Sequence, residues 1–369
     1  VDFSVDAPAK VKANSGAFNA NFGLSVVLPP SLTDIIKNTL QLTQLSITNA
    51  SFAVNVSGPT EKALTTTIAS QVVDLNGQVL CPGFIDAHVH IESSMLSVPE
   101  FARTVVACGT TAVMADPHEM ANVMGVEGIR FILRTSKYCP IHVYVMLSSC
   151  VPASHLESAG AELSAVDLHP FLSDRWVRGL GEMMNYPGVI RKEPEVLDKI
   201  RIVGQTPIDG HAPGLSGRDL CAYVAAGIRS DHEATTFEEG REKLRLGMHV
   251  MIREGSAARD FRSLQDMIAC HADMCMFCSD DKHPDDLVRG HMNDLVRDAI
   301  RNGHDPVKVL RCACLNPVRH YGLPVGQLQV GDPADFLVVD DIRDFHVLET
   351  YVSGRLVARE GTPLLDRVR

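Results

Sequence analysis

Two histidines separated by one residue, His88 and His90, stand at the end of an apolar run that begins with a Pro-Gly turn. The run is typical of a β-strand, and residues i and i+2 of a strand point to the same side. Both imidazoles can therefore reach one metal ion at the strand's end. Imidazole is a common metal ligand, so the pair predicts a metal site. The alternative is two polar residues on a strand exposed to water.

Histidines and carboxylates also follow most of the later apolar runs. They are Asp116, His118 and Glu119, then Glu182, His211, His232 with Glu233, Glu254 and Asp280. A lone histidine at such a place is ordinarily a solvated loop residue, but solvated residues have no reason to recur at the same end of successive strands. Four imidazoles and two carboxylates are enough for a two-metal centre. Glu182 is placed to lie between the ions and offset their repulsion, and the ligand types fit manganese, iron or zinc.

Such a site needs strands whose ends converge. Eight short apolar runs alternate with helical patterns, at residues 83–88, 110–115, 141–147, 177–181, 207–210, 227–231, 249–253 and 274–278. Helical periodicity lies between most of them, at 98–108, 126–135, 217–226, 236–246 and 263–271. This repeat predicts an α/β fold, a (β/α)8 TIM-like barrel over residues 81–320, whose active site lies at the carboxyl ends of the strands. A doubly wound open sheet is the competitor, but it would place ligands at one switch point.

The segments that flank the barrel are expected to form a small β-sandwich unit, built from residues 41–80 and 321–369. Strands are expected at 45–48, 71–75, 334–339 and 352–357, and helices at 294–301 and 306–314. Residues 1–40 match no pattern and are left unassigned, with a composition compatible with disorder.

The composition excludes several classes of partner. The chain has 369 residues and a formal net charge of −11, which argues against a nucleic-acid partner. No window of 18 residues is wholly apolar, so we expect no membrane span. The first 40 residues do not resemble a secretory signal. The 10 cysteines of the chain are scattered along the sequence, which favours reduced thiols and a cytoplasmic location. We also expect a homo-oligomer.

Longer motifs narrow the interpretation. Seven segments of the chain resemble the bacterial and archaeal adenine deaminases of the amidohydrolase superfamily. They are PGFIDAHVHIESSM (82–95), MADPHEMANV (114–123), GEMMNYPGV (181–189), GHAPGL (210–215), SDHE (230–233), MIREGSAARD (251–260) and CSDDKHPDDL (278–287). The resemblance covers about residues 80–350. The H-x-H pair alone marks only the superfamily, whereas the later motifs are specific to the deaminase branch.

The resemblance implies a set of six metal ligands: His88, His90, Glu182, His211, His232 and Asp280. They would hold two divalent ions, manganese or iron, with zinc as the alternative. Glu182 would bridge the ions where many relatives use a carboxylated lysine. The absence of lysine between Arg175 and Ile190 counts against those relatives.

The resemblance also implies a reaction, the hydrolytic deamination of adenine to hypoxanthine and ammonia in purine salvage. A metal-bound hydroxide would attack C6 of this small-molecule purine, and Asp280 would take the proton from the nucleophile. Glu233 would protonate the ring nitrogen. His118, Glu119, Asp281, His283 and Ser256 are candidates for substrate contact, and each could equally support a ligand or cap a loop.

Two alternatives remain open. One is another deaminase or cyclic amidohydrolase of the same superfamily. The other is a metal-binding but inactive homologue, since full-length adenine deaminases carry a further large domain after the barrel and we expect this chain to lack it.

Overall fold

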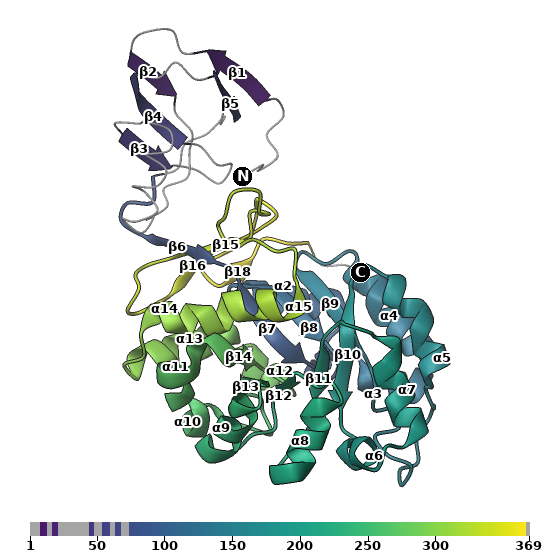
Figure 1. The fold of residues 1–369 in the computed structure, drawn as a ribbon. Coiled ribbons are helices and arrows are strands. Elements are labelled where there is room, and N and C mark those ends of the chain that lie inside the picture. Colours follow the sequence, from purple (N-terminus) through teal and green to yellow (C-terminus); the bar gives the residue numbers. More distant parts are fainter. Residues whose placement is uncertain are drawn as a thin grey trace.

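The computed structural model describes residues 74–366 and the backbone of five earlier strands (Figure 1). These strands are β1 (Pro8–Lys12), β2 (Ala17–Ala20), β3 (Gln44–Ile47), β4 (Val54–Pro59) and β5 (Ala63–Thr67). β1 pairs with β5, and β4 lies between β2 and β3, all antiparallel. The strand expected at 45–48 overlaps β3. Three residues of the strand expected at 71–75, Gln71 to Val73, lie outside the described residues.

Eight parallel strands form the centre of the molecule. They are β7 (Phe84–Val89), β8 (Thr110–Ala115), β9 (His142–Leu147), β10 (Val177–Met183), β11 (Ile208–Gly210), β12 (Ser230–Asp231), β13 (His249–Arg253) and β14 (Cys275–Cys278). Hydrogen bonding groups them as β11-β10-β9-β8-β7 and β12-β13-β14. A parallel bridge between Val89 and Asp280 joins β7 to β14, and the Arg229 N–H donates to the Ile208 carbonyl at the other seam. The chain therefore has the predicted TIM-like α/β fold rather than an open sheet.

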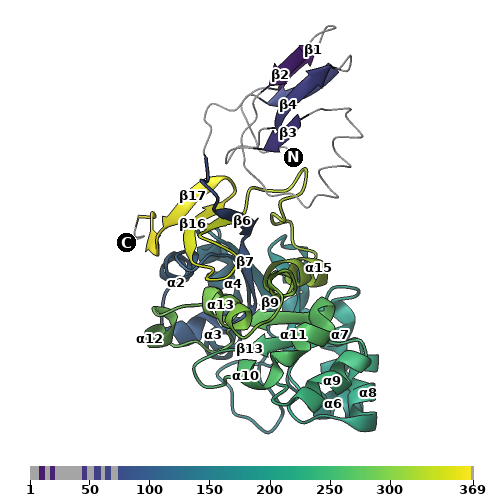
Figure 2. The same ribbon diagram turned by 90° about the vertical axis from the view of Figure 1, so that its left-hand side faces the viewer.

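Helices follow most of the strands and cover the barrel from outside (Figures 1 and 2). The longer ones are α2 (Val98–Val106), α3 (His118–Met124), α4 (Val126–Ser136), α7 (Pro194–Ile202), α8 (Gly217–Ala225), α9 (Phe237–Arg245) and α13 (Met292–Arg301). Shorter ones are α5 (Ala165–Leu168), α6 (Tyr186–Arg191), α10 (Phe261–Leu264), α11 (Asp266–His271), α12 (Pro284–Leu287), α14 (Pro306–Leu310) and α15 (Asn316–Tyr321). The helix expected at 263–271 is divided into α10 and α11. The one expected at 306–314 continues beyond α14 as the π-helical turn η4 (Arg311–Leu315).

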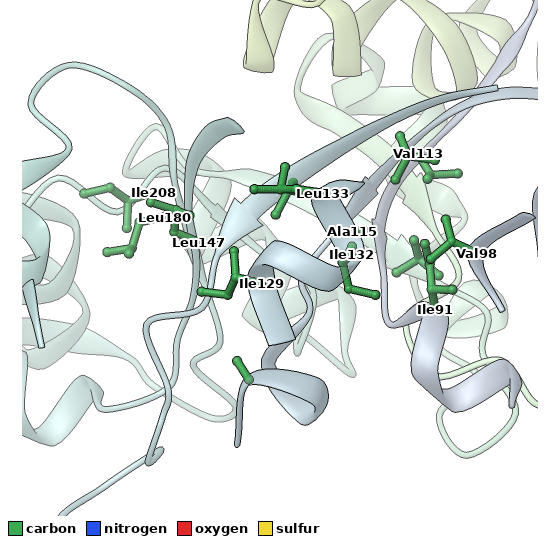
Figure 3. Packing of buried hydrophobic residues seen from close by; sticks show 14 of the residues in the cluster. Ile91, Val98, Val113, Ala115, Ile129, Ile132, Leu133, Leu147, Leu180 and Ile208 are labelled. Carbon is green, nitrogen blue, oxygen red and sulfur yellow. The ribbon is translucent and has the colours of Figure 1, made fainter. Parts of the chain in front are cut away.

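Alternate residues of each strand face two different parts of the core. In β8, Ala112 and Met114 belong to the cluster inside the barrel, whereas Val113 and Ala115 pack toward the helices. Figure 3 shows part of this outer layer, with Ala115 near Ile132 of α4. Because both faces are buried, the strands read as continuous apolar runs, which is why their positions could be predicted.

The flanking segments meet in one antiparallel sheet. Its order is β18 (Thr362–Pro363), β17 (Arg355–Arg359), β16 (Val347–Val352), β15 (Phe336–Val339) and β6 (Val79–Pro82). The prediction of one strand at 352–357 is wrong, because these residues include the turn between β16 and β17. Ser353 and Gly354 both have positive φ, 50° and 76°, the conformation that closes a two-residue hairpin.

The strand expected at 71–75 is also misplaced in its described part. Asp74 and Leu75 lie outside any strand, and Asn76 and Gly77 form a turn with φ of 49° and 88°. The strand follows this turn as β6, since its pairing partner β15 lies opposite residues 79–82.

Two expectations drawn from composition can be compared with the structure. All ten cysteines are free thiols. Within the described part of the chain, no helix is long and apolar enough to cross a membrane.

Candidate metal centre

All six predicted ligands come together at the carboxyl ends of the barrel strands. His88 is the last but one residue of β7, and His90 directly follows that strand. Glu182 lies in β10, and His211 and His232 directly follow β11 and β12. Asp280 follows β14. Five of the six are buried, and His211 is half-buried. The sequence prediction of their convergence is therefore confirmed, although their role as ligands stays a prediction.

Four of these side chains form what we call the deep group: His88, His90, Glu182 and Asp280. One atom from each lies within 4.8 Å of the others. The Nε2 atoms of His88 and His90 are 3.1 Å apart. Glu182 Oε1 lies 3.1 Å and 2.6 Å from these two nitrogens, and Asp280 Oδ1 lies 3.5 Å and 3.2 Å from them.

The other oxygen of Glu182 faces the shallow group, which consists of Glu182, His211 and His232. Glu182 Oε2 lies 2.7 Å from His211 Nδ1 and 3.7 Å from His232 Nε2. The rings of His232 and His88 stack with centroids 4.2 Å apart, so the two groups are adjacent. One carboxylate thus presents a separate oxygen to each group, which is the arrangement of a bridging ligand.

The spacing of these atoms suits a cation at the centre of each group. Ligand atoms about 2.1 Å from a tetrahedral ion lie about 3.4 Å from one another, and the deep-group distances of 2.6–3.5 Å are close to this value. Glu182 Oε1 and the Nδ1 atoms of His88 and His232 are buried without a hydrogen-bond partner. Glu182 Oε1 faces both imidazoles of the deep group, so a cation at the centre of that group would give this oxygen a partner.

The electrostatics of the deep group show how protons occupy this centre. Burial alone lowers the pKa of His88, but hydrogen bonds to Asp280 and Glu182 outweigh it and raise the pKa to about 10. Burial also opposes protonation of His90, yet Glu182 raises its pKa well above the usual value. Burial raises the pKa of Asp280, while hydrogen bonds from the two histidines lower it far more. The carboxylates thus attract positive charge strongly.

The shallow group differs in charge. Burial and the neighbouring charge of His88 lower the pKa of His232 to about 3, so its imidazole is neutral. Burial lowers the pKa of His211 as well, but its hydrogen bond to Glu182 produces a net rise. A neutral His232 imidazole is ready to bind a metal without first losing a proton.

Buried aspartates hold the strand ends that carry these side chains. Asp116 Oδ2 accepts the Glu182 N–H at 3.0 Å, and Asp116 Oδ1 accepts the Ser148 hydroxyl at 3.0 Å. Asp86 Oδ1 accepts the N–H groups of His88 and Ser279, at 3.3 Å and 3.0 Å. These aspartates fix the backbone beside the ligands and restrict where the side chains can lie.

A third buried aspartate ties the shallow group to Glu233. Asp231 accepts N–H groups from Ala212 at 2.9 Å and Glu233 at 3.0 Å. Lys243 on α9 donates to Asp231 Oδ2 at 2.7 Å, and both side chains are fully buried. The sequence analysis missed Lys243 because nothing in a helical pattern marks one lysine as buried. Glu254 directly follows β13, as expected, but it does not line the cavity beside the six residues and instead accepts the Phe261 N–H at 3.3 Å.

The five residues predicted to contact substrate lie in three different places. His118 and Asp281 line a cavity of about 150 Å³ beside the predicted metal ligands, with Glu233 and Arg253. Glu119 lies 3.4 Å from His90 Nδ1, beside the ligand. Ser256 and His283 lie outside this lining. The Ser256 hydroxyl donates to Asp286 at 2.8 Å and accepts the His283 N–H at 2.9 Å, which is a loop-stabilising arrangement.

Comparison with known proteins decides the family. The amidohydrolase family profile matches residues 79–357, which include the barrel and most of the sheet that flanks it. The chain belongs to the amidohydrolase family. Within the family, Glu182 occupies β10 with no lysine beside it, so a carboxylate and not a modified lysine stands between the two histidine groups.

The amidohydrolases similar in sequence include three curated adenine deaminases. The one from a Sulfurovum species is 51% identical over 291 residues, 78% of this chain and 55% of that protein. The one from Salinibacter ruber is 52% identical over 78% of this chain and 53% of that protein. The one from Desulfatibacillum aliphaticivorans is 49% identical over 84% and 56%. The chain thus spans about half the length of the curated relatives it matches.

Solved amidohydrolase structures share the fold at low sequence identity. A β-aspartyl dipeptidase from Fervidobacterium islandicum superposes with a TM-score of 0.60 and 17% identity, over 84% of this chain and 93% of that one. An N-isopropylammelide isopropylaminohydrolase from Burkholderia multivorans gives a TM-score of 0.55 and 16% identity, over 85% and 96%. These likenesses support the barrel architecture alone.

Proposed function

We propose that this amidohydrolase catalyses the hydrolytic deamination of adenine to hypoxanthine and ammonia. The relatives at about 50% identity carry the name adenine deaminase. The observation that supports catalysis most directly is that two histidine groups face opposite oxygens of Glu182. That arrangement suits two ions and one shared carboxylate.

Two divalent ions are proposed, with manganese or iron favoured and zinc as the alternative. His88, His90 and Asp280 would hold one ion, His211 and His232 the other, and Glu182 both. When bound, the ions supply Lewis acidity and lower the pKa of a water molecule. The ligand residues fit this purpose because their atoms converge in two adjacent groups and Glu182 Oε1 there has no hydrogen-bond partner.

Asp280 and Glu233 are proposed to move the protons. Asp280 is ionised in the structure because two histidines hold its pKa low, so it can accept a proton from the attacking water. Glu233 lies 3.5 Å from His232 Nε2 and lines the cavity, where it can deliver a proton to the purine ring nitrogen. Oxygen from water joins C6 while the amino group leaves as ammonia, so one water is consumed for each adenine.

The remaining cavity residues are proposed to place the ring. His118 lies 3.6 Å from Glu182 Oε1, at the edge of the deep group. Asp281 faces the cavity from the loop after β14 and accepts the Ser93 hydroxyl. We propose direct substrate contact for these two residues. Glu119 is proposed to support His90, since it contacts that ring and not the cavity.

The test is an assay of the chain after manganese, iron or zinc is added to the metal-free protein. Adenine should yield equal amounts of hypoxanthine and ammonia, while adenosine and a hydantoin should react far more slowly. Turnover of another ring with none of adenine would show a different amidohydrolase. Full metal binding without turnover of any ring would show an inactive homologue.

We also propose that residues 81–320 form the catalytic barrel, and that residues 41–80 and 321–369 form a β-sandwich unit beside it. The sheet of β6 and β15–β18 would be one layer of that unit. A homo-oligomer and a cytoplasmic location complete the proposal. Light scattering on the purified chain tests the assembly.

A further inference from the structure

One arginine joins both proton-transferring residues. Arg253 is the last residue of β13, and its side chain is only 6% exposed. Its Nη1 donates to Asp280 Oδ2 at 3.0 Å and also to Glu233 Oε1. Nη2 approaches Glu233 Oε2 at 3.4 Å. A single guanidinium therefore contacts two carboxylates that belong to different strands, Glu233 after β12 and Asp280 after β14.

The opposite edge of the guanidinium is fixed by a third carboxylate. Arg253 Nε lies 2.9 Å from Asp260 Oδ2, and Nη2 lies 2.9 Å from the same oxygen. The Asp260 N–H in turn donates to the Arg253 carbonyl at 2.9 Å. Asp260 does not line the cavity, so it acts as an anchor that sets the plane of the guanidinium.

Only arginine can make this set of contacts. Its guanidinium is a rigid plane with five N–H donors, whereas lysine offers one compact charge at the end of a flexible chain. A carboxylate oxygen of Glu233, a carboxylate oxygen of Asp280 and a ring nitrogen of His232 all lie within 4.8 Å of one another. Two carboxylates so close together in a buried site repel each other unless a cation lies between them. Burial lowers the pKa of Arg253, but the charge and hydrogen bond of Glu233 and the charge of Asp280 together raise it by a larger amount, so the guanidinium stays positively charged.

We propose that Arg253 is a positioning residue that holds Glu233 at the angle and distance needed for proton delivery to the ring while keeping it beside Asp280. The inference rests on the proposed deaminase reaction. Arg253 would act through the two carboxylates rather than through a bond to the purine. Its loss should therefore lower kcat much more than it changes KM, because the ring would still bind while the proton donor would be misplaced.

Three variants test the idea in the metal-loaded chain. Arg253→Met removes the cation, and we expect kcat to fall about 10²-fold, the lower end of what a positioned acid or base contributes. Arg253→Lys keeps the positive charge but loses the planar set of N–H donors, so its kcat should remain below that of the wild-type chain. Asp260→Asn releases only the anchor and should lose less than either. Circular dichroism verifies that each variant is folded.

Added guanidinium ion separates positioning from a merely structural role. It should restore part of the kcat of Arg253→Met, because the ion can enter the space left by the side chain and contact both carboxylates. The matched control is Arg359→Met, whose arginine pairs with Glu349 at 2.9 Å on the flanking sheet. That variant should keep full kcat and should not respond to guanidinium. Unchanged kcat in Arg253→Met, or full activity in Arg253→Lys, would overturn the proposal.

A second measurement does not depend on turnover. In the metal-free protein, Arg253→Met should lower Tm in the wild-type background and lower it less when Glu233→Gln is already present, since the lost ion pair is then absent. Equal Tm changes in both backgrounds would show that Arg253 does not hold Glu233. If the wild-type chain deaminates nothing, the proposed function fails while this Tm cycle still reports on the pairing.

Discussion

The deep and shallow groups share Glu182 but bind positive charge differently. The deep group places two histidines against two carboxylates in full burial, so hydrogen bonds to Asp280 and Glu182 raise the pKa of His88 to about 10. The shallow group has one carboxylate for two histidines, and the pKa of His232 falls to about 3. The contrast teaches that protons compete with a metal ion for the deep group far more than they do for His232 in the shallow group.

The largest expected effect comes from the residue that the two groups have in common. Glu182→Gln should reduce bound metal from two ions per chain to one or fewer, because both groups lose an anionic oxygen. Turnover should fall by more than the roughly 10–100-fold typical of losing a partner outside the ligand sphere. Metal analysis by mass spectrometry measures the first effect. Two retained ions would show that Glu182 does not bridge.

Glu233 lies beside the shallow group without being a proposed ligand. Glu233→Gln should therefore keep two ions per chain yet lose about 10²–10⁴-fold in turnover, the usual contribution of a positioned acid or base. Metal content and the rate of ammonia release are measured on the same sample. Loss of an ion would place Glu233 among the ligands, and full activity would remove it from the reaction.

Single histidine variants test whether the groups act as separate sites. His211→Asn should leave close to one ion per chain, held by the deep group with its four buried ligands. His90→Asn should lower the metal affinity of the deep group, and the remaining imidazole of His88 should not restore that affinity. Isothermal titration with manganese distinguishes one from two binding steps. Equal losses in both variants would mean that the groups bind as a single unit.

The pH dependence of metal binding sharpens the comparison. Below pH 10 His88 carries a proton that a metal must displace, so deep-group affinity should rise with pH, about tenfold per unit for each proton released. The pKa of His232 is about 3, so this ligand adds no such dependence at neutral pH. Titrations in two buffers of different ionisation enthalpy count the protons released. Absence of proton release between pH 6 and 9 would contradict the assignment.

The smallest effect concerns the metal-free fold. The pKa of His88 is about 10 in the folded chain and about 6.5 in an unfolded one, so protonated His88 stabilises the fold. This contribution is complete below pH 6.5 and is lost as the pH rises toward 10. The Tm of the metal-free chain should therefore decrease over that interval. His88→Asn should flatten the decrease.

The barrel could be predicted because its strands are buried on both faces and read as apolar runs; the predicted bounds of β8 and β13 agree with the structure at every residue. The convergence of the six proposed ligands could be predicted because they lie at the ends of those runs. Local patterns did not reveal partners that only folding brings together. Lys243 meets Asp231 from the next helix, and Arg253 meets Glu233 and Asp280 from neighbouring strands. The Ser353–Gly354 hairpin was missed although its residue types favour a turn.

The seam between the first and last barrel strands has a consequence for how the molecule comes apart. The Asp280 N–H donates to the His88 carbonyl and the His90 N–H to the Asp280 carbonyl, at 2.9 Å and 3.3 Å. Side chains of the same three residues make up most of the deep group. An ion held there would act as a removable cross-link between the two ends of the barrel sequence, and closing so long a loop would restrict the unfolded chain. When a chelator removes the ion, β7 and β14 should therefore separate at this seam first, and a protease should make its first cleavages there.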